Sequence, residues 1–122
     1  MADPKPIQLH GKPVGGGAFP LICTPLVGRT RERVLAETAS VLAKRPDVIE
    51  WRIDYFEGIA DTPVVLEVAR AIRHAAGDTP IILTRRSIRE GGESITLDDE
   101  GVVRLYAAVG ADHSVDFVDF EM

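Results

Sequence analysis

The chain has 122 residues, of which 45% are hydrophobic and 27% are charged, and its formal net charge at pH 7 is −5. This length and composition fit one globular domain and exclude disordered and collagen-like classes. The acidic balance argues against nucleic-acid binding, which requires a basic surface. No apolar run reaches the roughly 20 residues needed to cross a bilayer, and the first residues lack a signal-peptide pattern. We therefore expect a cytoplasmic protein with no membrane partner.

The first 18 residues form a separate arm in this interpretation. They contain the stretch "IQLHGKPV", followed by three consecutive glycines at 15–17. The pattern fits either a small hairpin turning at Gly11–Lys12 or a loose arm, and it does not choose between them. The chain is accordingly divided into an arm at 1–18 and one domain at 19–122.

The domain alternates short apolar segments with amphipathic ones. Four short segments, bounded by proline or turn residues, are predicted as buried strands over 20–26, 48–54, 80–86 and 115–122. Three segments with apolar residues at helical spacing are predicted as helices over 31–45, 64–76 and 97–109. We expect Thr30 and Thr62 to be the N-caps of the first two helices, and Gly77 to end the second.

Strands that alternate with single helices indicate an α/β fold with right-handed parallel crossovers. Two architectures remain open: a doubly wound sheet, or part of a β/α barrel. A closed barrel typically needs about 250 residues, so this chain is too short to form one by itself. In both architectures the ligand-binding residues lie at the carboxyl ends of the strands.

Charged residues gather where the predicted strands end. In "IEWRIDYF" (49–56) the odd-numbered residues from Ile49 to Ile53 are apolar, and the alternate positions carry Glu50, Arg52 and Asp54. The third strand ends with Arg85 and Arg86, and the fourth contains Asp119 and Glu121. Because burying an unpaired charge is costly, these side chains are expected to pair with one another or with a ligand.

The sequence pattern does not decide which of Arg85 and Arg86 points to the charged face of the sheet. Either Ile82, Thr84 and Arg86 point to the charged face, or Ile81, Leu83 and Arg85 do. A polar loop with two adjacent glycines follows at 87–94. Such loops can close over ligands.

The cysteine, histidine and lysine residues give little evidence of a catalytic or metal-binding role. Cys23 lies in an apolar run, so we expect it to be a small buried residue, and one cysteine excludes a disulfide framework. No histidine spacing suggests a metal, and we predict neither a metal nor a cofactor. The three lysines, Lys5, Lys12 and Lys44, lie outside the predicted strands, so none is placed to act as a Schiff-base nucleophile.

Three of the segments together resemble a known family. "IEWRIDYF", "IILTRRSIREGGE" and "VDFVDFEM" are similar to the amino-terminal half of a type I 3-dehydroquinate dehydratase, and "ICTPLVG" is similar to its first barrel strand. The combination of E-W-R-x-D with R-S-x-x-E-G-G-E is specific, whereas either motif alone is weak. The resemblance implies a partial (β/α)8 TIM barrel of about four parallel strands and three crossover helices, preceded by a short hairpin or arm.

The resemblance also implies an activity. This family removes water from 3-dehydroquinate to give 3-dehydroshikimate in the shikimate pathway, through a Schiff base formed by a lysine and with a histidine that moves protons. It implies that Glu50, Arg52 and Arg86 bind the substrate and that Glu90 is a catalytic carboxylate on the closing loop. The family's histidine and lysine belong to the fifth and sixth strands, so the 122-residue chain alone is expected to be inactive.

A different class of function stays open beside this one. The chain could be a non-catalytic α/β module for binding or assembly that pairs with another chain. Four strands leave two apolar edges, and exposed edges promote self-association. We therefore expect a homo-oligomer formed through these edges, in addition to a small-molecule substrate.

Overall fold

A computed structural model describes residues 7–9, 12–14, 22–86, 88, 92 and 94–120. Strands β1 (Ile7–Leu9) and β2 (Lys12–Val14) pair in an antiparallel hairpin, which is one of the two alternatives that the sequence left open. Lys12 is the first residue of β2 and pairs with Leu9 of β1, so it belongs to a strand and not to the predicted turn.

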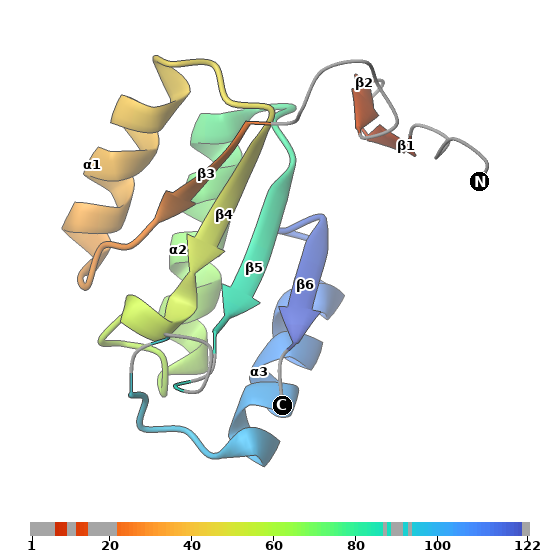
Figure 1. The fold of residues 1–122 in the computed structure, drawn as a ribbon. Helices are drawn as coiled ribbons and strands as arrows, with labels where there is room; N and C mark the ends of the chain where they lie inside the picture. The colour runs from red at the N-terminus through yellow and green to blue at the C-terminus, as the bar shows by residue number, and fades with distance from the viewer. Residues whose placement is uncertain are drawn as a thin grey trace.

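The domain is a four-stranded parallel sheet whose strands follow one another in chain order. The strands are β3 (Cys23–Leu26), β4 (Val48–Arg52), β5 (Ile81–Arg85) and β6 (Phe117–Phe120). Successive strands are joined by helices α1 (Arg31–Leu42), α2 (Thr62–Ala76) and α3 (Asp99–Asp112). Figure 1 shows these four strands pointing the same way, with the helices along one side of the sheet. A doubly wound sheet would reverse its strand order, so the structure confirms the α/β prediction and has the order of a barrel sector.

The core lies between the sheet and the helices. Ile49, Trp51 and Leu83 on the strands are fully buried, and so are Val68 and Ile72 on α2. The Trp51 ring meets the Phe56 ring edge-on, with centroids 5.6 Å apart. Each such aliphatic side chain contributes about 1.5–3 kcal/mol on burial, so the helix-facing side of the sheet supplies most of the apolar stabilisation.

The ends of α1 follow from local chemistry. The Thr30 hydroxyl accepts a hydrogen bond from the Arg33 N–H at 3.3 Å, so the predicted N-cap is confirmed. The helix ends at Leu42 instead of residue 45. Arg45 has a φ of 52° and precedes Pro46, whose ring disfavours the helical conformation for the residue before it.

The cap predicted for α2 was wrong by one residue. The carboxylate of Asp61, and not Thr62, caps the helix by accepting from the Val64 N–H at 3.4 Å. The third helix likewise starts at Asp99, two residues later than predicted, because the Asp98 carboxylate accepts from the Gly101 N–H at 2.7 Å. Carboxylates are favoured at helix N-termini because the backbone there carries partial positive charge.

One arginine ties together three segments at the amino edge of the sheet. The Arg73 guanidinium donates to the carbonyls of Ser114 (3.2 Å), Gly77 (3.2 Å) and Thr79 (3.1 Å), and it also pairs with Asp116. Asp116 in turn accepts from the Ile81 N–H at 2.8 Å. These contacts join the segments that precede β5 and β6 at the end of the sheet opposite the carboxyl ends of the strands.

The backbone at Gly28 approaches α1 too closely for a side chain. A Cβ there would lie 2.7 Å from the Val34 backbone nitrogen and 2.9 Å from the Arg33 carbonyl carbon. We expect Gly28→Ala to lower the free energy of unfolding by about 1–3 kcal/mol, because neither backbone atom can move aside cheaply. The measurement is urea unfolding followed by circular dichroism.

The matched control for this prediction is Gly110→Ala. A Cβ at Gly110, in α3, meets no atom within 4 Å, so the higher helix propensity of alanine should raise the stability by up to about 1 kcal/mol. Equal stability of the Gly28→Ala variant and the unmodified chain would contradict the close-approach argument.

Candidate functional site

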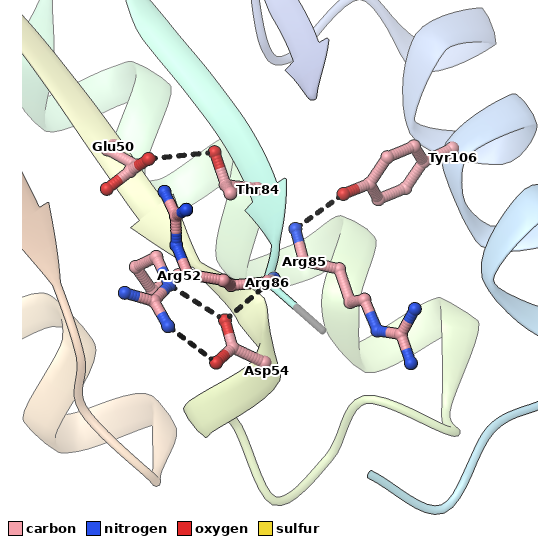
Figure 2. A network of polar contacts seen from close by, with 7 residues as sticks. All are labelled: Glu50, Arg52, Asp54, Thr84, Arg85, Arg86 and Tyr106. Atoms are coloured by element: carbon pink, nitrogen blue, oxygen red, sulfur yellow. Dashed lines mark hydrogen bonds and ion pairs between the residues drawn. The ribbon is translucent and has the colours of Figure 1, made fainter. Parts of the chain in front are cut away.

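Polar side chains lie on the face of the sheet opposite the described helices, near the carboxyl ends of β4, β5 and β6. The register places Glu50 opposite Ile82, Arg52 opposite Thr84, and Thr84 opposite Asp119. The Thr84 hydroxyl is buried and donates to Oε2 of Glu50 at 3.0 Å (Figure 2). Glu50 is thus held in place by a neighbouring strand.

The predicted strand at 48–54 stops two residues early, and this changes the place of Asp54. Residues Ile53–Tyr55 form a short 3-10 helix, η1, which turns the Asp54 carboxylate back toward Arg52. The carboxylate accepts from Nε and Nη2 of Arg52 at 2.9 and 2.8 Å, as Figure 2 shows. The Asp54 side chain is fully buried and that of Arg52 is 13% exposed. The hydrogen bonds to Asp54 raise the pKa of Arg52, and this side chain is held in one orientation.

The Arg52 guanidinium also stacks against an aromatic ring. Its carbon lies 5.1 Å from the Tyr55 ring centroid, and the Arg29 guanidinium lies 5.4 Å from the same ring. The pattern of alternating charges had given no role to Tyr55 or to Thr84. Tyr55 reaches Arg52 because η1 turns the chain after β4, and Thr84 reaches Glu50 through the register of β4 and β5.

Glu50 and Arg52 each present one further hydrogen-bonding atom on this face. Within the described part of the chain, Oε1 of Glu50 and Nη1 of Arg52 have no bonding partner, although the other polar atoms of both side chains do. One is an acceptor and the other a donor. The face can therefore take a ligand that offers hydroxyl or carboxylate groups.

The structure separates the two arginines that follow one another on β5. The Arg85 guanidinium lies 3.6 Å from Asp99 at the start of α3, on the helix side. Figure 2 shows the Arg86 side chain on the side of Arg52 and Asp54, and Arg85 extending the other way. The Arg86 backbone N–H donates to Asp54 at 3.4 Å. The structure therefore brings Arg86 to the same face as Glu50 and Arg52, and their binding role stays a prediction; the predicted catalytic Glu90 lies outside the described residues.

The prediction that Cys23 is buried was wrong, because its side chain is exposed. Cys23 pairs with Val48 in the register and so lies on the face of Glu50, which no described helix covers. Partial desolvation and the Glu50 charge raise the pKa of the Cys23 thiol. The thiol is thus a neutral group on the same face as the charged side chains.

The lysine and histidines with described side chains lie away from this face. Lys44 follows the end of α1, His74 is in the last turn of α2, and His113 caps the end of α3. Helices in such units run back against the strands, so their ends lie at the amino edge of the sheet. Among the described residues no cluster of histidine, cysteine or carboxylate side chains could hold a metal. No described helix has the length and apolarity to span a membrane.

Asp54 should be important for stability because it neutralises Arg52. We expect Asp54→Asn to lower the free energy of unfolding by about 3 kcal/mol, since it leaves a mostly buried guanidinium without its counter-charge. Urea unfolding of the variant measures the loss. Glu100→Gln is the control: it removes the charge of an exposed pair with Arg104 and should change the stability by less than about 0.5 kcal/mol. Similar values for the two variants would contradict the role of Asp54.

The Tyr106 hydroxyl joins the ends of β5 and β6. It accepts from the Arg85 N–H and donates to the Asp119 carbonyl oxygen, each at 2.6 Å. The side chain is nearly buried, and burial raises its pKa far above the ordinary value of 10.0. The phenol therefore keeps its proton under all physiological conditions.

This raised pKa predicts a loss of stability at alkaline pH. Above pH 10 the unfolded chain loses the Tyr106 proton while the folded chain retains it, so the free energy of unfolding falls as the pH rises. We expect the stability advantage of the unmodified chain over Tyr106→Phe to be constant between pH 7 and 9 and to shrink by pH 11. Urea unfolding at each pH tests this, and a constant difference through pH 11 would contradict the raised pKa.

Fold and site together define a sector of a parallel β/α barrel with paired polar side chains at the carboxyl ends of its strands. The model of the family described as Type I 3-dehydroquinase matches residues 22–122. The chain therefore belongs to the type I 3-dehydroquinase family.

Several relatives show how much of a family member this chain represents. It is 52% identical over 122 residues to the 3-dehydroquinate dehydratase of Albidiferax ferrireducens, a match that covers 100% of this chain and 46% of that protein. It is 47% identical to the 3-dehydroquinate dehydratase of Aromatoleum aromaticum, over 100% of this chain and 47% of that protein. The crystal structure of the 3-dehydroquinate dehydratase from Geobacillus kaustophilus matches with a TM-score of 0.92 at 42% identity, over 97% of this chain and 46% of that one. The chain spans about half the length of these relatives and corresponds to their amino-terminal half.

Proposed function

We propose that this chain is the substrate-binding, amino-terminal part of a 3-dehydroquinate dehydratase. The observation that supports this most is the pair of atoms on Glu50 and Arg52 that have no partner among the described residues, on side chains held by Thr84 and Asp54, in a chain of this family. A rigid acceptor beside a rigid donor suits a ligand with several hydroxyl groups and a carboxylate. The substrate 3-dehydroquinate has these groups.

Each side chain has a distinct part in this proposal. The open carboxylate oxygen of Glu50 accepts a hydrogen bond from a substrate hydroxyl, and Arg52 donates to a substrate oxygen. Arg86 adds a second positive charge on the same face. Because a hydrogen bond to a charged group contributes about 1.5–3 kcal/mol, losing one arginine should weaken binding tenfold or more. Glu90 is the proposed carboxylate of the loop that closes over the ligand.

The chemistry itself requires a lysine and a proton carrier at this face. In the proposed reaction the lysine amine adds to the substrate ketone, and loss of water gives an iminium. The iminium makes the neighbouring C–H more acidic, so that its proton is removed. The β-hydroxyl then takes up a proton and leaves as a second water. Hydrolysis of the iminium takes up one water and frees the lysine. Lys44 is at the opposite edge of the sheet, so the described residues bind and orient but do not form the imine.

The edges of the sheet support a second proposal, that the chain assembles with another copy. Apolar side chains are exposed beside the two outer strands: Ile22 (60%) and Val27 (37%) at β3, and Phe117 (38%) and Val118 (45%) on β6. Strand edges of this kind promote association. We propose a cytoplasmic homo-oligomer formed through these edges, and light scattering that shows a monomer at high concentration would reject it.

Borohydride trapping tests whether this chain can form the imine. We expect the mass of the chain to stay unchanged after incubation with 3-dehydroquinate and borohydride, because Lys44, the lysine whose side chain is described, lies away from the binding face. An adduct on Lys5, Lys12 or Lys44 would contradict this expectation.

Titration with 3-dehydroquinate tests binding directly. The single thiol, Cys23, lies on the binding face, so saturating ligand should slow its alkylation, and Arg86→Gln should weaken that protection at least tenfold. Arg104→Gln is the control, because Arg104 is exposed on α3 and distant from the face. If Arg86→Gln and the unmodified chain are protected equally, or if neither is protected, the binding role is wrong.

A further inference from the structure

Glu50 and Arg52 carry opposite charges on one face of β4, yet they do not pair with each other. They are two residues apart in the strand, so their side chains point to the same side of the sheet. Among the described residues, the Arg52 guanidinium pairs with Asp54 and the Glu50 carboxylate bonds to Thr84. Opposite charges on neighbouring side chains attract each other. The separation of these two groups therefore needs a cause.

Asp54 accounts for the position of Arg52. Its fully buried carboxylate accepts from Nε and Nη2 of Arg52 at 2.9 and 2.8 Å. Of the groups that raise the pKa of Arg52, Asp54 contributes most, through its hydrogen bonds, and the charge of Glu50 contributes least. The guanidinium is thus held by Asp54 and not by Glu50.

Thr84 accounts for the position of Glu50. In the register Glu50 pairs with Ile82, and Thr84 pairs with Arg52. The Thr84 hydroxyl nevertheless donates to Oε2 of Glu50 at 3.0 Å, so the carboxylate extends toward the next pair, in the direction of the carboxyl ends of the strands. Figure 2 shows Glu50 turned to Thr84 and Arg52 turned to Asp54.

A buried threonine hydroxyl suits this task. Thr84 is 0% exposed, so its side chain is fixed by the packing around it. A hydroxyl is a neutral donor, so it occupies one oxygen of the carboxylate and leaves the negative charge in place. A guanidinium partner would instead neutralise that charge. Valine has nearly the same shape as threonine and lacks the donor.

We propose that Thr84 is a positioning residue of the site: its hydroxyl turns the Glu50 carboxylate away from Arg52 and so keeps an acceptor and a donor separately available to a ligand. This inference deepens the proposed function and rests on it for the identity of the ligand. Thr84 acts through Glu50 and needs no contact with the ligand. Without the hydroxyl, Glu50 pairs with the guanidinium of Arg52, and a ligand must first break that ion pair.

The test compares Thr84→Val, which lacks the hydroxyl, with Thr84→Ser, which retains it, in the 122-residue chain. Thr38→Val is the control, because the buried Thr38 hydroxyl donates to the Val34 carbonyl at 2.8 Å on α1. Its loss removes a comparable hydrogen bond away from the site. Binding of 3-dehydroquinate is measured by calorimetry, and the side-chain Nε–H of Arg52 is followed by NMR without ligand.

We expect Thr84→Val to bind 3-dehydroquinate more weakly by about fivefold or more. Thr84→Ser and Thr38→Val should bind it as the unmodified chain does. Equal binding by Thr84→Val and the unmodified chain overturns the proposal. Equal weakening by Thr84→Val and either of the other two variants also overturns it, because the loss would then not follow the Thr84 hydroxyl.

The Arg52 signal separates the positioning role from the identity of the ligand. We expect Thr84→Val to shift this signal, because the Glu50 carboxylate then reaches the guanidinium, and Thr84→Ser to restore it. If the unmodified chain does not bind 3-dehydroquinate, the proposed function fails for this chain, and a shift that serine reverses still supports positioning by Thr84. An unshifted signal in Thr84→Val overturns the proposal whatever the binding result.

A second pair of variants covers the case in which Thr84→Val does not fold. Thr84→Ala and Thr84→Ser both lose the methyl group, and only serine keeps the hydroxyl. The alanine variant should then show the weaker binding and the shifted Arg52 signal. Equal binding and equal Arg52 signals in these two variants would show that the hydroxyl does not position Glu50, and this overturns the proposal.

Discussion

The two-point contact between Arg52 and Asp54 is the constraint on which the site depends. It ends β4, because the carboxylate can reach the guanidinium only if the chain turns into η1 after Arg52. It also neutralises a charge that the sheet could not otherwise hold near its core. The same carboxylate contacts the first residue after β5. One buried side chain thus relates the ends of two strands and the two arginines that they carry.

Much of the fold was predictable because the spacing of apolar residues along the sequence follows the buried face of each helix and strand. The alternation in "IEWRIDYF" assigned Trp51 to the helix side and Glu50 to the opposite side, and the structure places Trp51 in the core and bonds Glu50 to Thr84. Element ends were less predictable, since Asp61 and Thr62 are both good N-caps and only the final geometry selects between them.

The relations across the sheet were the part of the site that sequence reasoning could not reach. The burial of Cys23 was predicted wrongly because an apolar run does not show that one face of its strand lacks a helix. The contacts of the Tyr106 hydroxyl with Arg85 and Asp119 depend on how α3 packs beside the ends of β5 and β6, which helical spacing alone does not show. The two β5 arginines could be told apart only through the family resemblance, and the structure gives the reason: Asp99 at the start of α3 attracts Arg85.

The contacts of Arg73 at the amino-terminal ends of the strands affect how the sequence of this domain can vary in evolution. That guanidinium satisfies carbonyls from the segments before β5 and β6, at the edge remote from Glu50 and Arg86. The spacing of these strands is therefore anchored at one end independently of what occupies the other. Side chains on the open face can vary, and new ligand preferences can arise, while the anchored edge keeps the strands in register.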